Sequence, residues 1–279
     1  MHIALRPIYT IAKKELSDNV RNKWIVAMVA IFLTLTIASS FMAGRGQVGE
    51  MGATVGALMS ISSMLVPVIS IMLGYGAISG EVESGALSVV LSYPVRRVEI
   101  LLGKYLGLGA VICISILVGF GVSGLIIALT TGTAQWGAYI AFILLTMLLG
   151  MLYLSLSMCF SSVLKRRVTS LAAGVLVFFL GLILGMIMMG AWMATGGSLE
   201  AIMTGDTSGI PDWFWFEVFV SPQDGNGAAA MLAFGTTEFL GFDMALPPWI
   251  TLGTLALAQL IWTIVPLALA CFFFQRRDI

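Results

Sequence analysis

The stretch Gly80–Lys104, GEVESGALSVVLSYPVRRVEILLGK, is a polar insert between two apolar segments that are each long enough to cross a bilayer. Two acids, Glu81 and Glu83, open it, and acids in a first helical turn interact favourably with the helix dipole. Pro94 disfavours helical backbone at the residue before it, so a helix that starts at the acids ends just ahead of this proline. We therefore predict a short helix over 80–93 that presents a surface outside the membrane.

The composition of the chain indicates a membrane protein. Of its 279 residues, 59% are hydrophobic and 10% are charged, whereas a soluble domain carries about 25% charged residues. So few charges cannot cover a water-facing surface, which leaves a polytopic membrane protein as the class. Single cysteines in apolar stretches pack as small apolar residues, and no disulfide framework is visible. The cysteines are Cys113, Cys159 and Cys271.

Apolar segments long enough to cross a bilayer, which takes about 20 residues, follow one another along the chain. The uncharged run from Tyr105 to Leu164 is too long for one helix, and the polar residues 130–135 divide it into two. We predict an all-α polytopic membrane protein, one transmembrane domain over 1–279. Its six predicted spans are 24–44, 53–77, 106–129, 137–160, 169–193 and 249–273.

Residues 5–22 have the pattern of an amphipathic helix ahead of the first span. Apolar residues recur every three or four positions from Leu5 to Val20, and charged residues cover the opposite side. A basic amphipathic helix in this position lies in the membrane interface; a solvated stub beside the membrane is the alternative. The residues that we single out on this helix are Lys13, Lys14, Glu15, Leu16 and Arg21.

Basic residues sort to one side of the predicted spans. Apart from Arg45, every Lys and Arg falls in the N-terminal helix and its junction with the first span, in 96–104, in 165–167 or at 276–277. Cytoplasmic loops of membrane proteins carry the excess of Lys and Arg. We therefore predict a multi-pass protein of the cytoplasmic (plasma) membrane, with both termini and the 80–93 helix on the cytoplasmic side.

The segment 195–248 is external in this topology and has acids but no Lys or Arg. We interpret it as a lid lying on the membrane, with the aromatic residues 213–216 at the headgroup level. Its acids form a solvated, negatively charged outer face in this interpretation, and a cation site is the alternative. They are Glu200, Asp206, Asp212, Glu217, Asp224, Glu238 and Asp243.

Signatures of enzymes and of self-powered transporters are missing. The chain has one histidine, His2, and no GxxxxGK[ST] loop, so it cannot hydrolyse ATP by the P-loop route. No HExxH or Cys/His metal spacing occurs, and we predict no catalytic residue, no metal site and no cofactor. Every charge lies near a span end or in a loop, whereas ion-coupled transporters place ionisable groups inside the membrane. We therefore expect the source of free energy in another protein that contacts the cytoplasmic surface.

Three further patterns each have two interpretations. Glycine pairs with GxxxG spacing allow close helix contact, within the chain or at a subunit interface. The methionines are flexible apolar packing or a soft-metal path. Glu81 and Glu83 are solvated loop acids or contacts to a basic pocket of a partner, and we favour the partner because the loop around them is too apolar to stay uncovered. The glycine pairs are Gly52/Gly56, Gly76/Gly80, Gly103/Gly107 and Gly181/Gly185.

The N-terminal helix and the Gly80–Lys104 loop resemble those of the ABC-2 type permease family. The resemblance implies an exporter-type (type V) fold of six spans with an N-terminal elbow helix, 5–22, and a coupling helix, 80–93, that docks on a separate ATPase subunit. The residues that carry it are Ile11–Leu16, Arg21–Trp24, Gly80–Leu87, Leu91–Arg97 and Ile100–Lys104. It implies ATPase-coupling roles for Glu81, Glu83, Gly85, Leu87, Leu91, Tyr93 and Pro94. The permease subunits of transporters that help mature nitrous oxide reductase are also similar to this chain in residues 12–18, in the spacing of Tyr93-Pro94 to Ile100–Lys104, and in residues 221–224.

We therefore expect the membrane subunit of an ABC transporter, an exporter, that pairs with a second copy or a homologue and with an ATPase subunit. Membrane lipid is a further expected partner, and nucleic acid is not. The alternative is a membrane anchor or assembly scaffold for an extracytoplasmic partner in copper-enzyme maturation, which predicts that ATPase mutants keep full function. An ion-coupled secondary transporter is disfavoured by the lack of charge inside the predicted spans.

Overall fold

The computed structural model describes residues 5–43, 51–131, 135–198, 209–236, 238–239, 242–243 and 246–277. The predicted loop around Arg45 lies outside the described residues, as do residues 199–208 of the predicted external segment, with Glu200 and Asp206. The side chain of Leu91 is outside the description as well, although its backbone belongs to a helix.

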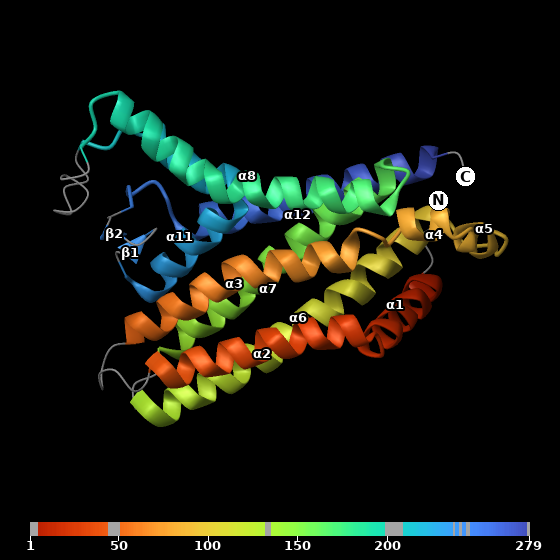
Figure 1. Cartoon of the computed structure of the whole chain (residues 1–279), viewed down its shortest axis with the longest axis horizontal. Helices are drawn as coiled ribbons and strands as arrows, with labels where there is room; N and C mark the ends of the chain where they lie inside the picture. Colours follow the sequence, from red (N-terminus) through yellow and green to blue (C-terminus); the bar gives the residue numbers. More distant parts are fainter. Residues whose placement is uncertain are drawn as a thin grey trace.

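Long helices form most of the described structure, and the prediction of an all-α membrane protein is confirmed. They lie side by side along the long axis of the molecule (Figure 1). The short pieces are α1 (Leu5–Val20), α4 (Ser79–Glu83) and α5 (Ala86–Leu91). The long helices are α2 (Lys23–Ala43), α3 (Met51–Gly74), α6 (Arg97–Thr131), α7 (Trp136–Val163), α8 (Arg167–Ala194) and α12 (Leu252–Arg276).

Five stretches of the described residues are long and apolar enough to cross a membrane. The described apolar part of α2 is shorter, Val29–Ala38, so a sixth span over α2 stays a prediction. The five candidate spans are Leu58–Glu83, Arg97–Ile126, Trp136–Val163, Arg167–Ala194 and Leu252–Arg276.

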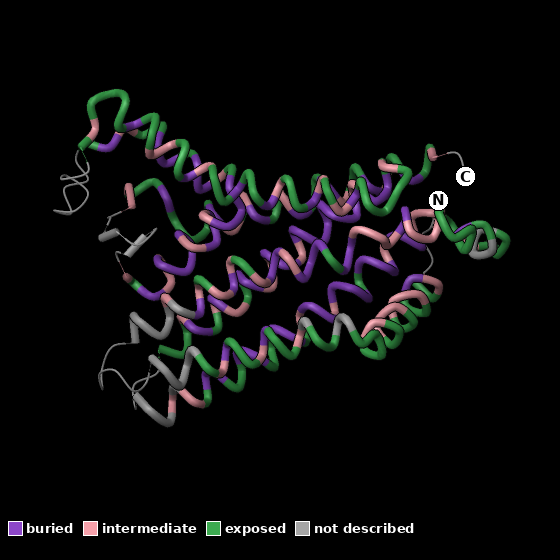
Figure 2. Tube along the Cα trace, viewed as in Figure 1, coloured by how far each residue is buried: buried purple, intermediate pink, exposed green. Residues whose placement is uncertain are grey.

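The helix α7 is the centre of the bundle. It packs against α3, α6, α8, α11 (Pro222–Phe234) and α12, and buried residues follow it along most of its length (Figure 2). Small side chains let neighbours approach it: Gly150 faces Ile112 of α6, and Ser157 Oγ donates to Ile71 O of α3 at 3.0 Å. The largest core cluster therefore joins residues of α2, α3, α6, α7 and α12.

One end of the bundle collects the positive charges, and we call it the basic end. The termini, α1, the α4–α5 hairpin and the α7–α8 turn all lie there (Figure 1). The described Lys and Arg residues belong to these elements and to the adjoining ends of α2, α6 and α12. This segregation is the one that the sequence predicts for the cytoplasmic side.

The described part of the predicted external segment is folded against the bundle. It contains the 3₁₀ turn η1 (Phe214–Phe216), α10 (Glu217–Val220), α11, and the paired two-residue strands β1 (Glu238–Phe239) and β2 (Phe242–Asp243). The helix α11 packs on α7, α12, α3 and α8 at the end of the molecule away from α4 and α5 (Figure 1). It begins with Ser221 Oγ accepting from Asp224 N at 3.3 Å, and it ends at Gly235, whose φ of 66° suits glycine.

Two expectations for this segment are wrong in part. Phe214 and Trp215 are buried in a core cluster with Trp192 and Val218, so the aromatic run does not lie wholly at a surface. Glu217 is 1% exposed and does not belong to a solvated acidic face. The physical reason is its neighbours: residues 213–220 are so apolar that burying them carries the one acid inside as well.

Candidate functional site: a cross-linked surface at the basic end

The contact between α1 and α6 at the basic end depends on two glycines of α6. A methyl group on Gly103 would lie 2.7 Å from Ile11 Cβ, and one on Gly107 would lie 2.6 Å from Ala12 O. Only glycine therefore allows the two helix backbones to approach so closely. The sequence predicts that this glycine pair serves close helix contact, either within the chain or at a subunit interface. In the structure it serves contact within the chain.

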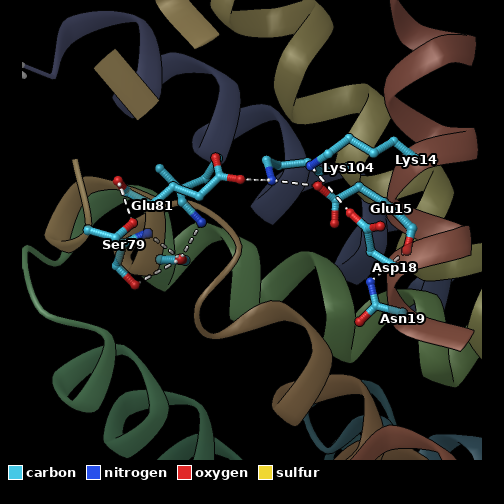
Figure 3. A network of polar contacts seen from close by, with 10 residues as sticks. Lys14, Glu15, Asp18, Asn19, Ser79, Glu81 and Lys104 are labelled. Carbon is cyan, nitrogen blue, oxygen red and sulfur yellow. Dashed lines mark hydrogen bonds and ion pairs between the residues drawn. The ribbon is translucent and has the colours of Figure 1, made fainter. Parts of the chain in front are cut away.

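This close approach brings an acid of α1 to a lysine of α6. Lys104 Nζ lies 2.7 Å from Glu15 Oε1 and 2.6 Å from Glu81 Oε1, so one ammonium joins α6 to both α1 and α4 (Figure 3). The Lys104 side chain is 5% exposed, and those of Glu15 and Glu81 are 14% and 24% exposed. Breaking a pair at this depth costs about 3–5 kcal/mol, because the charge that remains loses its partner.

The α4 helix is also fixed to the end of α7. Ser161 Oγ accepts hydrogen bonds from Ile78 N and Ser79 N, each at 3.0 Å, and lies 3.1 Å from Ser79 Oγ. These bonds satisfy backbone N–H groups that the first turn of a helix leaves unpaired. The hairpin is therefore connected to the centre of the bundle as well as to α1.

Glu83 makes a weaker link from α4 to α8. Its Oε2 lies 3.5 Å from Arg167 Nε, and its Oε1 accepts from Arg167 N at 3.2 Å. The Arg167 side chain is 62% exposed and that of Glu83 is 35% exposed. A surface pair of this kind contributes about 0–1 kcal/mol.

The other predicted coupling residues divide between the core and the surface. Gly85, with φ of 72°, makes the left-handed turn between α4 and α5 that glycine permits. Leu87 is fully buried and anchors α5 to the largest core cluster. Tyr93 is 65% exposed and Pro94 is exposed beside it, at the point where α5 leads into α6.

The predicted residues of α1 also point in two directions. Glu15 and Leu16 face the bundle, Glu15 toward Lys104 and Leu16 toward the largest core cluster. Lys13, Lys14 and Arg21 are exposed. Six exposed residues of the two predicted sets form the surface that the sequence predicts for docking, which we call the docking face; it lies on the elements that project from the basic end (Figure 1). Its members are Lys13, Lys14, Arg21, Gly85, Tyr93 and Pro94.

Sequence reasoning missed several residues that hold this end together. Arg97 Nη1 donates to Phe274 O at 3.1 Å and to Gln275 O at 3.3 Å at the end of α12. Arg277 donates to Ser161 O, Ser162 O and Leu164 O at 2.9–3.1 Å at the end of α7. Cations are favourable at helix C-termini, which carry the negative end of the dipole.

A signal for Lys104 was available in the sequence. It is the only charge that lies beyond the third residue of the α6 helix, and an ionisable residue in a spanning helix needs a partner. The sequence could not say which acids these partners are, because Glu15 is 89 residues away and Glu81 is 23 residues away.

Comparison with known proteins gives a consistent result over nearly the whole chain. A family model described as ABC-2 family transporter protein matches residues 9–279. A protein of Stutzerimonas stutzeri described as probable ABC transporter permease protein NosY is 31% identical over 294 aligned residues, which cover 98% of this chain and 99% of the relative. The protein of the same description from Pseudomonas aeruginosa is 32% identical, with the same coverage.

Proposed function

This chain belongs to the ABC-2 family of transporter proteins and is a permease subunit of an ABC transporter, and from that premise we propose how it obtains its energy. A separate ATPase subunit docks on α1 and on the α4–α5 hairpin. ATP hydrolysis in that subunit moves these elements, and the movement drives export of a substrate across the plasma membrane. The chain itself supplies no ATPase site, since its sequence has no P-loop.

The observation that carries the proposal is the double ion pair of Lys104. Because Lys104 Nζ binds Glu15 Oε1 and Glu81 Oε1 at once, a push on either α1 or α4 is passed to α6. The links through Ser161 and Arg167 extend the same unit to α7 and α8. A cross-linked end that moves as one body suits a rigid-body alternation better than a flexible loop does.

The charge distribution supports the proposed orientation. The described Lys and Arg residues gather at the basic end, and such residues favour the cytoplasmic side. We therefore place both termini and the docking face in the cytoplasm, where a nucleotide-dependent subunit has access to ATP. The described part of the 195–248 segment then belongs to the outer half of the molecule.

The chain is one transmembrane domain over 1–279, with α1 as the elbow helix, α4–α5 as the coupling hairpin and α2 as the sixth span. It works as a dimer with a second copy or a homologue, because one six-span unit forms half of a transporter in this family.

The test is co-purification of the permease with its ATPase subunit and measurement of ATP turnover in the complex. Tyr93→Ala removes an exposed aromatic residue from the docking face, and we expect it to weaken the association roughly tenfold. Trp136→Ala is the matched control, since Trp136 is 47% exposed and begins α7 at the opposite end of the bundle. If both variants bind the ATPase equally well, the docking face is elsewhere. If function persists with an inactive ATPase, the scaffold alternative is correct.

A further inference from the structure

A second cluster of polar groups lies in the half of the molecule away from the basic end. Glu217 begins α10 and Asp224 lies in the first turn of α11, and both acids approach the same glycine of α8. A methyl group on Gly185 would lie 3.4 Å from Glu217 Oε1 and 3.7 Å from Asp224 Oδ2. The glycine pair of α8 therefore makes room for side chains of this protein.

Two neutral polar side chains approach α8 one turn earlier. A methyl group on Gly181 would lie 2.4 Å from Gln223 Oε1 and 3.6 Å from the Tyr153 hydroxyl. Gln223 is 3% exposed and Tyr153 is 1% exposed. Together with the acids, they surround one side of α8 with oxygen atoms from α7, α10 and α11.

The polar atoms of this cluster lack partners among the described residues. Both carboxylate oxygens of Glu217, Asp224 Oδ2, Gln223 Oε1 and Nε2, and the Tyr153 hydroxyl are buried without a hydrogen bond. A buried polar atom without a partner costs about 1–3 kcal/mol, and more when it is charged. Four such side chains in one place indicate a polar occupant.

The two acids of the cluster also lack a counter-ion among the described residues. Neither acid forms an ion pair with a described residue, and the α8 face between them carries glycines. Burial raises the pKa of Glu217 to about 8, and the neighbouring Asp224 adds to the shift. Burial raises the pKa of Asp224 to about 6, against the effect of a hydrogen bond from Ser221. Once these protons are lost, the two neighbouring carboxylates need a cation to balance them.

We propose that Glu217, Asp224, Gln223 and Tyr153 form a binding site for a hard cation, with a divalent ion such as Ca²⁺ balancing the two carboxylates. Carboxylate, amide and hydroxyl oxygens are the ligands that Ca²⁺ accepts, whereas soft metals prefer sulfur. The described residues hold no cluster of three or more His, Cys, Asp or Glu side chains, so neutral oxygens complete the coordination. The proposal is independent of ATPase docking.

The experiment uses the full-length protein in detergent, stripped with a chelator and then titrated with Ca²⁺, Mg²⁺ or Na⁺ at constant ionic strength. Thermal unfolding is followed at about pH 8.5, above the pKa values of both acids, and at about pH 5, below both. We expect Ca²⁺ to raise the unfolding temperature by several degrees at the higher pH. The effect is lost at the lower pH, because protons then occupy the carboxylates.

Conservative variants separate this site from the rest of the surface. Glu217→Gln and Asp224→Asn keep the shape of each side chain and remove its charge, so we expect folded proteins without the response to Ca²⁺. Asp212→Asn is the control, because Asp212 is an exposed acid of the same segment. The proposal is overturned if none of the three ions stabilises the unmodified protein at the higher pH. It is equally overturned if the two buried-acid variants respond as the unmodified protein does.

Discussion

Lys104 of α6 and Glu81 of α4 form an ion pair of 2.6 Å across the loop that separates them. The same ammonium reaches Glu15 of α1 at 2.7 Å, so the loop and the N-terminal helix share one buried cation. The proposed route from the ATPase to the membrane runs through this point.

Replacing Lys104 by methionine tests the junction itself. The substitution leaves Glu15 and Glu81 facing each other without a counter-charge, and we expect a loss of about 3–5 kcal/mol in unfolding free energy. Thermal unfolding in detergent measures the change, and ATP turnover in the complex shows the loss of coupling. Lys14→Met is the control, since Lys14 pairs with Asp18 on the surface, with side chains 65% and 58% exposed. An equal effect of both variants would contradict a special role for Lys104.

Replacing Gly107 by alanine tests the packing of α1 on α6. The added methyl group would meet the backbone of Ala12, which cannot rotate away, so α1 must shift and carry Glu15 away from Lys104. We expect a lower unfolding temperature and weaker coupling to ATP hydrolysis. Gly121→Ala is the matched control on α6, because no atom of the described residues lies within 4 Å of its added methyl group. That control should gain up to about 1 kcal/mol from helix propensity.

The buried acid Glu217 predicts a pH dependence of stability in the absence of divalent ions. Its pKa is about 8 in the folded protein, above the ordinary value of 4.5, so the folded state holds the proton more tightly than the unfolded state does. Stability is therefore highest below pH 4.5, as far as this group is concerned, and falls as the pH rises toward 8. Glu217→Gln should remove this fall and raise the unfolding temperature near pH 8. Thermal unfolding curves in a chelating buffer, recorded at several pH values, measure this dependence. Identical pH profiles for the unmodified protein and for Glu217→Gln would contradict the prediction.

Much of the fold could be predicted from the sequence, because it depends on local signals. Long uncharged runs predict the spanning helices. The positions of Lys and Arg along the chain predict which helix ends lie together at one end of the bundle. At α12 the local signal is a cap: Thr251 Oγ1 accepts from Thr254 N at 3.2 Å, and the helix covers Leu252–Arg276, where the sequence predicts a span over 249–273. Other bounds differ from the prediction: α6 begins at Arg97, well before the span predicted from 106, and Gly85 divides the helix predicted over 80–93 into α4 and α5.

The contacts between distant residues could not be predicted in the same way. The roles of Glu81 and Glu15 depend on the packing of α1 against α6, which no local pattern encodes. The burial of Glu217 depends on how α10 and α11 fold against α8, and the acid looks like a loop residue in the sequence. In each case the residue type shows that the side chain is an acid, whereas tertiary packing determines which groups surround it.

The most direct test of the central claim is labelling of a cysteine placed at the docking face. Tyr93→Cys puts a thiol at a position that is 65% exposed, while the three native cysteines are partly buried. With a membrane-impermeant thiol reagent, we expect labelling in inside-out vesicles but not in right-side-out vesicles. With the ATPase subunit added in enough excess to offset the weaker docking of a Tyr93 variant, its binding should then protect the thiol. Labelling from the outer side, or equal labelling with and without bound ATPase, would contradict the account.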